Sequence, residues 1–247
     1  VNVLCEKPLG ISPADLDAVL EAERNSPAML GVCLQNRYEP NILRLREEAR
    51  RCGVAAAFGT VAWKRDAAYY ASGAWRGRWA TEGGGVMINQ ALHTLDLLQW
   101  ICGMPESVTA HTANDHLRGQ IEVEDTATGY FRLPDGGCFN LFATTACAGD
   151  FPAQLHLLTR DGHRCFADNT SLTRDGEPLP GERSATAGKT VWGTGHKRLI
   201  ADFYRCLAGG EAFPIDGREG AKVIRLILAM YASAKENCTK TLTEETI

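Results

Sequence analysis

The pattern of hydrophobic and polar residues along residues 1–52 predicts two strand–helix units. Two continuous apolar runs predict buried strands, and two further stretches repeat apolar residues at helical spacing. The predicted strands are residues 1–5 and 28–34, and the predicted helices are residues 13–24 and 40–52. Ser12 is a typical N-cap and Pro13 a typical first helical residue. The alternation favours a parallel sheet of the α/β class.

After residue 52 the pattern changes to that of an α+β protein. The segments are a strand at 57–65, a loop at 66–84 rich in aromatic residues and glycine, helices at 83–102, 196–207 and 218–237, and a loop at 182–195. Between residues 106 and 174, Asp-Gly turns join short extended runs, which is a strong hairpin signal. We therefore predict an open antiparallel sheet of about five to seven strands, flanked by helices.

The composition is that of an ordinary globular chain. Of 247 residues, 45% are hydrophobic and 23% are charged, and a net charge of −4 gives no sign of a nucleic-acid partner. No apolar run is long enough to indicate a membrane partner. Nine scattered cysteines without a C-x-x-C pair favour reduced thiols and a cytoplasmic location. Six dispersed histidines form no metal-binding spacing, so we expect no metal site.

The helical segment at 83–102 carries the most informative polar residues. Asn89, His93 and Asp96 stand at i, i+4 and i+7, so they are expected to share one face beside an apolar stripe. Buried polar groups need partners or a purpose. A histidine near a helix N-terminus stays neutral and can take a proton from a hydroxyl. The alternative is a buried histidine with a purely structural role, whose hydrogen bonds are satisfied within the protein.

Three other places have both a functional and a structural interpretation. Lys7 follows the first strand, and ligands of open α/β sheets bind beyond the carboxyl ends of strands; the alternative is a lysine that points to solvent. Arg37 follows the second strand in the same way. Trp75 and Arg76 suit a sugar ring and an anionic substituent, or else anchor a packed loop.

Several motifs occur in a fixed order along the chain. They are Glu6-Lys7-Pro8, Gly83-Gly84-Gly85, His93-Thr94-Leu95-Asp96, Gly195-His196 and Phe213-Pro214-Ile215-Asp216. In this order they resemble the Gfo/Idh/MocA oxidoreductase family, which includes glucose–fructose oxidoreductase and inositol dehydrogenase. The resemblance implies the C-terminal part of a dinucleotide-binding Rossmann domain at 1–52 and a substrate-binding α+β domain at 53–247. We expect the helix at 218–237 to pack back on the first segment.

The resemblance also implies which residues form a site. Lys7, His93 and Asn89 would be catalytic; Glu6, Lys7, Pro8 and Arg37 would contact the cofactor; and Lys64, Trp75, Arg76, Asp96 and His196 would contact the substrate. Asn89 stands where many members carry Asp, and an Asn side chain cannot accept a proton. With His93 as the base, activity in the oxidation direction would rise with pH through an ordinary histidine pKa.

The implied function is an NAD(P)-dependent dehydrogenase that oxidises a secondary alcohol of a sugar, cyclitol or nucleotide-sugar, or catalyses the reverse reaction. The alternatives are a non-catalytic sugar-binding or oligomerisation module and an NAD-using glycosidase-like member. The chain contains no G-x-G-x-x-G turn and begins within a predicted strand, so we expect most of the NAD or NADP site to lie outside it. We expect little activity from this chain alone. The resemblance also implies a homodimer or homotetramer joined through the sheet face.

Overall fold

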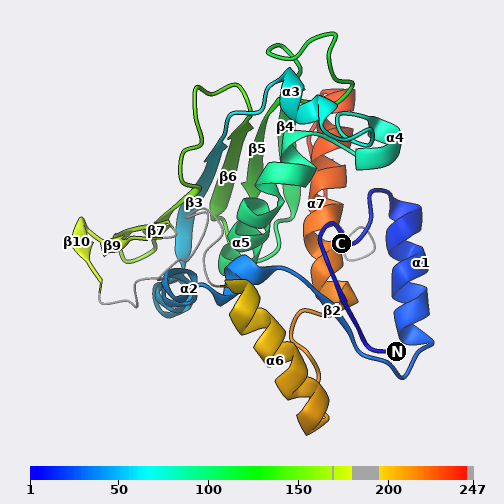
Figure 1. Ribbon diagram of the computed structural model, residues 1–247. Coiled ribbons are helices and arrows are strands. Elements are labelled where there is room, and N and C mark those ends of the chain that lie inside the picture. The colour runs from blue at the N-terminus through cyan, green and yellow to red at the C-terminus, as the bar shows by residue number, and fades with distance from the viewer. Residues whose placement is uncertain (169, 180–194, 244–247) are drawn as a thin grey trace.

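A computed structural model describes residues 1–168, 170–179 and 195–243 (Figure 1). The chain begins with two short parallel strands, β1 (Val3–Cys5) and β2 (Leu30–Val32), joined by α1 (Pro13–Arg24). Ser12 caps α1 in a capping box with Asp15. A short 3₁₀ helix, η1 (Gln35–Tyr38), then leads into α2 (Pro40–Cys52). Both helices have the predicted bounds, and both strands are shorter than predicted.

A nine-stranded sheet dominates the rest of the structure. Its order is β10-β9-β8-β7-β3-β6-β5-β4-β11. The strands are β3 (Val54–Ala62), β4 (Ser107–Ala113), β5 (Thr126–Arg132), β6 (Cys138–Thr144), β7 (Gln154–Thr159), β8 (Arg164–Ala167), β9 (Leu172–Arg174), β10 (Glu177–Pro178) and β11 (Lys240–Thr241). The Asp-Gly turns join β5 to β6, β7 to β8 and β9 to β10, as predicted.

Two details of the predicted sheet are wrong. The sheet has nine strands, and it is mixed because β3 and β6 pair in parallel. The helix α5 (Leu92–Cys102) lies between β3 and β4 in sequence, so the chain crosses over and β4 runs in the direction of β3. The meander β4–β5–β6 then reverses twice and returns β6 to β3 in the same direction.

Helices cover one face of this sheet. The helices α2, α5 and α7 (Gly217–Glu236) lie side by side, with α5 over β3 and β6 and α7 over β4. Phe131 and Phe139 stack in the core beneath them, with ring centroids 4.5 Å apart. The helix α7 also contacts α1 and β2, while α6 (Gly195–Gly209) packs against η1 and extends away from the sheet. In the described part of the chain, no helix combines the length and apolar character needed to cross a membrane.

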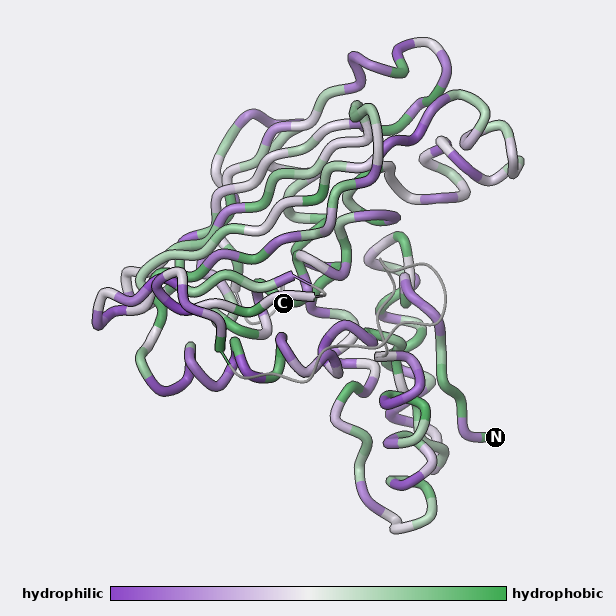
Figure 2. The backbone as a smooth tube through the Cα atoms, turned by 60° about the vertical axis from the view of Figure 1, so that its left-hand side comes forward, coloured by the Kyte–Doolittle hydropathy of each residue, from purple (hydrophilic) through white to green (hydrophobic). Residues whose placement is uncertain are grey.

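The opposite face of the sheet carries exposed aromatic side chains. Phe58, Tyr130 and Phe142 are each more than two-fifths exposed and line a shallow groove of about 580 Å³. Along the strands, hydrophobic and hydrophilic residues alternate, as the tube in Figure 2 shows. This face therefore combines apolar surface with accessibility to solvent.

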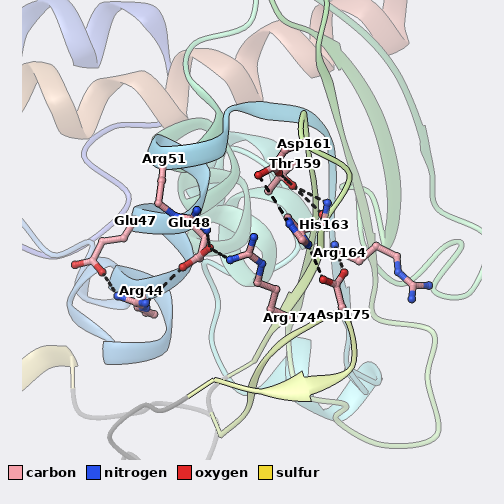
Figure 3. A network of polar contacts seen from close by, with 10 residues as sticks. All are labelled: Arg44, Glu47, Glu48, Arg51, Thr159, Asp161, His163, Arg164, Arg174 and Asp175. Carbon is pink, nitrogen blue, oxygen red and sulfur yellow. Dashed lines mark hydrogen bonds and ion pairs between the residues drawn. The ribbon is translucent and has the colours of Figure 1, made fainter.

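A polar network fastens the far edge of the sheet to α2 (Figure 3). The buried Glu48 of α2 pairs with Arg51 at 2.5 Å, with Arg174 of β9 at 3.2 Å and with Arg44 at 3.5 Å. On the strand side, His163 lies 2.6 Å from Asp175. The network joins α2 to strands that lie more than 100 residues later in the sequence. Within the described residues, no group of three potential metal ligands occurs here or elsewhere.

The predicted loop and helix between residues 66 and 102 have more structure than expected. Two short helices, α3 (Ala67–Ala71) and α4 (Trp79–Glu82), interrupt the loop. The predicted helix begins instead with a π-helical turn, η2 (Met87–Ala91), and continues as α5. Of the predicted loop at 182–195, all but Gly195 lies outside the described residues.

Candidate active site

The predicted residue Lys7 lies directly after β1 and reaches across to η2. Its Nζ atom donates a 2.7 Å hydrogen bond to the backbone carbonyl of Asn89. Burial lowers the pKa of Lys7, and Arg76 adds to this effect, whereas Glu6 and Glu82 oppose it. The ammonium is therefore easier to deprotonate than that of an ordinary lysine.

The glycine triplet lets the start of the helix pack tightly against its surroundings. A Cβ atom would lie 1.9 Å from the hydroxyl of Tyr231 at Gly84 and 1.9 Å from the carbonyl of Glu124 at Gly85. The Glu124 carboxylate accepts hydrogen bonds from the backbone N–H groups of Gly85 at 2.9 Å and Met87 at 3.0 Å. Burial raises the pKa of Glu124 to about 7. This carboxylate fixes the start of the helix that carries Asn89 and His93.

Asn89 contacts a carboxylate that was not predicted as part of the site. Its Nδ2 atom donates to Glu82, which also accepts a 2.5 Å hydrogen bond from the backbone of Gly77. Glu82 is only 5% exposed, and burial raises its pKa despite these donors and the nearby Lys7 and Arg76. The one sequence signal was an acidic residue directly before the glycine triplet. Asn89 therefore lies between a buried carboxylate and the lysine, with its side chain oriented by Glu82.

His93 lies against η1 and is held neutral. Its Nε2 atom is 3.2 Å from Nε2 of Gln35, while the buried His93 Nδ1 and Gln35 Oε1 have no partner among the described residues. Burial first, and then Lys7 and His196, lower the pKa of His93 to about 3. A ring with this pKa is neutral throughout the physiological range, which argues against the expected rise in activity through an ordinary histidine pKa. Gln35 was missed, although it stands only two residues before the predicted Arg37.

Arg37 and Asp96 form a buried ion pair with each other. Arg37 donates to Asp96 through Nε at 2.8 Å and Nη2 at 2.5 Å, and through Nη1 to Glu219 of α7 at 2.7 Å. Arg37 is 2% exposed and Asp96 is 1% exposed. The contacts tie η1, α5 and α7 together. Asp96 therefore directs its carboxylate at Arg37 and not at His93, and all three guanidinium nitrogens are engaged within the protein.

The remaining predicted residues lie around this centre at different depths. His196, in the first turn of α6, is close enough to His93 to lower its pKa, and the adjacent Gly195 donates a 2.5 Å hydrogen bond to Glu39. Trp75 is exposed, and the Arg76 guanidinium lies 4.4 Å from the centre of its ring. Lys64 is exposed beyond β3, and its backbone N–H bonds to Asp150.

Comparison with known proteins relates this chain to a family of dehydrogenases. The model of the GFO/IDH/MocA C-terminal domain matches residues 54–163. Myo-inositol 2-dehydrogenase of Thermotoga maritima is 22% identical over 250 residues, which cover 98% of this chain and 73% of that protein. The WlbA dehydrogenase of Bordetella pertussis, solved with NADH and UDP-GlcNAcA, is 26% identical with a TM-score of 0.81, covering 98% of this chain and 72% of that one. Residues 54–163 thus match the C-terminal domain of the Gfo/Idh/MocA family, and the chain shares the fold of these dehydrogenases.

Levoglucosan dehydrogenase, solved with NADH and levoglucosan, has the same fold, with a TM-score of 0.82 at 18% identity over 98% of this chain and 74% of that one. The segment that matches the Gfo/Idh/MocA model begins at β3 and contains Asn89 and His93, whereas Lys7 and Gln35 precede it. The recognition made from the short motifs is confirmed. The fold class is confirmed as well, as an open sheet flanked by helices, with the correction that the sheet is mixed.

Proposed function

We propose that this protein is an NAD(P)-dependent dehydrogenase that interconverts a secondary alcohol of a sugar, cyclitol or nucleotide-sugar with the corresponding ketone. The observation that carries the proposal is the hydrogen bond of Lys7 to the carbonyl of Asn89, one helical turn before a neutral His93 whose pKa Lys7 lowers. The buried atoms His93 Nδ1 and Gln35 Oε1 have no hydrogen-bond partner among the described residues, and such unsatisfied polar groups are typical of functional sites. The dehydrogenases named above, two of them solved with NADH, support this assignment.

Lys7 and His93 have different tasks in the proposed reaction. A ring with a pKa of about 3 is a weak proton acceptor, so His93 hydrogen-bonds the substrate hydroxyl and orients it. Lys7, with its lowered pKa, accepts the hydroxyl proton in oxidation and returns it in reduction. As an ammonium it also stabilises negative charge on the reacting oxygen. A bound nicotinamide supplies the redox chemistry, as hydride acceptor or donor.

The cofactor contacts that we propose in this chain are Glu6, Lys7 and Pro8, at the carboxyl end of β1. The hydrogen-bond donors of Arg37 are engaged by Asp96 and Glu219. We therefore propose that Arg37 positions η1, which carries Gln35, and α5. Asp96 likewise acts by positioning α5. The proposed substrate-facing residues remain Asn89, His196, Lys64, Trp75 and Arg76.

The test is a panel of sugars, cyclitols and nucleotide-sugars, assayed on the full-length protein with NAD⁺ and NADP⁺ by absorbance of the reduced cofactor. Reduction of NAD⁺ or NADP⁺ that requires a substrate of one of these classes supports the proposal. Binding of sugars without any turnover would indicate a non-catalytic module. Cleavage of a glycoside without net reduction of added cofactor would indicate a glycosidase.

The pH dependence of the reaction should follow Lys7. Oxidation needs the neutral amine, so its rate should rise with pH on the alkaline side, with a midpoint below the ordinary lysine pKa of 10.5, and reduction should show the opposite trend. His93→Gln should lower kcat but leave this midpoint in place, because His93 is neutral above about pH 3. Profiles of kcat against pH for the wild-type and His93→Gln proteins show whether Lys7 or His93 is the titrating group. A midpoint near 6.5 that disappears in His93→Gln would contradict this division of tasks.

We also propose that the protein acts in the cytoplasm as a homodimer or homotetramer joined through the exposed sheet face. Light scattering at micromolar concentration should report a mass of two or four chains. A Phe58→Lys/Phe142→Lys variant should shift the mass towards the monomer, because it places two charges in the apolar groove. Tyr204→Lys, at an exposed aromatic residue of α6, is the matched control and should leave the mass unchanged. A wild-type monomer would refute the proposal.

A further inference from the structure

Arg76 is held in a fixed orientation between two aromatic rings. Its guanidinium carbon lies 4.3 Å from the ring centre of Tyr69 and 4.4 Å from that of Trp75. Its Nη1 atom also donates to the Tyr69 hydroxyl, which lies 3.3 Å from Nε2 of Gln90. Gln90 is the neighbour of Asn89 in η2. The contacts set the plane of the guanidinium at the edge of the proposed catalytic centre.

The charge of Arg76 is not balanced by an ion pair. The nearby Arg65 pairs with Asp150 at 2.9 Å and Arg78 pairs with Glu122 at 3.8 Å, whereas no carboxylate among the described residues lies within 4.0 Å of the Arg76 guanidinium. Its positive charge nevertheless reaches the centre, where it contributes to the lowered pKa of Lys7 and opposes the rise in the pKa of Glu82. Of its five N–H donors, only the one to Tyr69 is matched with a side-chain acceptor in the described part of the chain.

We propose that Arg76 binds an oxyanion carried by the sugar substrate, either a carboxylate or a phosphate. A planar guanidinium with free donors matches both groups, and the exposed face of Trp75 beside it can cover the sugar ring. The inference rests on the proposed dehydrogenase function and narrows its substrate class. Acidic sugars should be preferred over neutral sugars and cyclitols.

The experiment compares four substrates that differ in charge: glucose, glucuronate, glucose 6-phosphate and UDP-glucuronate. For the wild-type protein, kcat/KM should be higher for an anionic member than for glucose. Arg76→Gln should lower kcat/KM for the anionic member by about 10- to 100-fold, the scale of a lost charged hydrogen bond, with a much smaller loss on glucose. Arg76→Lys should recover part of this loss, because it keeps the charge without the planar donors. The contrast between glucuronate and glucose 6-phosphate tells which oxyanion Arg76 binds.

Arg78→Gln is the matched control. Arg78 lies in the same segment, is exposed and forms only a long ion pair, so its loss should not distinguish anionic from neutral substrates. Calorimetric binding of the same four compounds to the wild-type and variant proteins separates the two proposals. If the anionic sugars bind through Arg76 but none reduces the cofactor, the dehydrogenase assignment fails and this inference stands. If Arg76→Gln weakens the binding of all four compounds equally, or of none of them, the inference is overturned. This holds whichever substrate the enzyme oxidises.

Discussion

Replacing Lys7 with Met in the full-length protein is expected to lower kcat by about 100-fold or more, the usual scale for a positioned acid–base or charge-stabilising group. The substitution keeps most of the side-chain length and removes the amine. It therefore removes both the proton acceptor and the positive charge opposite the reacting oxygen. Steady-state kinetics with the substrate found in the panel measure the effect.

The change should act on chemistry and not on folding. Circular dichroism and thermal melting should match the wild-type protein, and the alkaline limb of the pH profile should be absent. Lys235→Met, at an exposed lysine in the last turn of α7, provides the control and should keep normal kcat. Near-normal turnover by a folded Lys7→Met protein would remove Lys7 from the mechanism.

Replacing Arg37 with Met should reduce the free energy of unfolding by about 3–5 kcal/mol, the usual cost of removing one partner from a buried ion pair. The loss leaves Asp96, which is 1% exposed, with Gln99 as its remaining side-chain partner and with Glu219 nearby. Asp96 would then be a buried carboxylate without its cation, whereas Glu219 would keep its ion pair with Lys222 at 2.6 Å. Urea unfolding monitored by circular dichroism gives the free energy.

An exposed ion pair of similar geometry provides the comparison. Arg132 and Glu106 are 2.7 Å apart, with side chains 61% and 36% exposed, so Arg132→Met should cost less than about 1 kcal/mol. The double variant Arg37→Met/Asp96→Leu should recover part of the stability, because it no longer buries an unpaired charge at residue 96. Equal losses in the free energy of unfolding for Arg37→Met and Arg132→Met would mean that the buried pair has no special role in stability.

Local signals in the sequence predicted the elements that local interactions determine. The bounds of α1 and α2 follow from a helical apolar pattern with proline at the first turn, and the hairpins follow from their Asp-Gly turns. The position of Lys7 after a strand could be predicted in the same way, although β1 is partly exposed and not buried as its apolar run predicted. The parallel pairing of β3 with β6 could not, because it depends on a crossover through α5 and on strands about 80 residues apart.

The partners of the site residues were also beyond sequence reasoning. Helical spacing placed Asn89, His93 and Asp96 on one face, but in the structure Asn89 contacts Glu82, His93 contacts Gln35 and Asp96 contacts Arg37. These partners come from α4 and η1, so their proximity depends on tertiary packing. The low pKa of His93 has the same origin, since burial and the neighbouring charges arise only after folding.

The π-helical turn Met87–Ala91 carries Asn89 and lies between the glycine triplet and α5, which carries His93. A π-helical turn contains more residues than an α-helical turn, so it changes the angle between the segments on either side of it. Deleting one residue there would rotate the preceding segment by about 100° relative to α5, while the contacts of α5 with the sheet could persist. Asn89 and the carbonyl that holds Lys7 would turn away from His93. Insertions and deletions in this short stretch are thus a route by which a protein with this scaffold can lose or reshape its site and still keep its core.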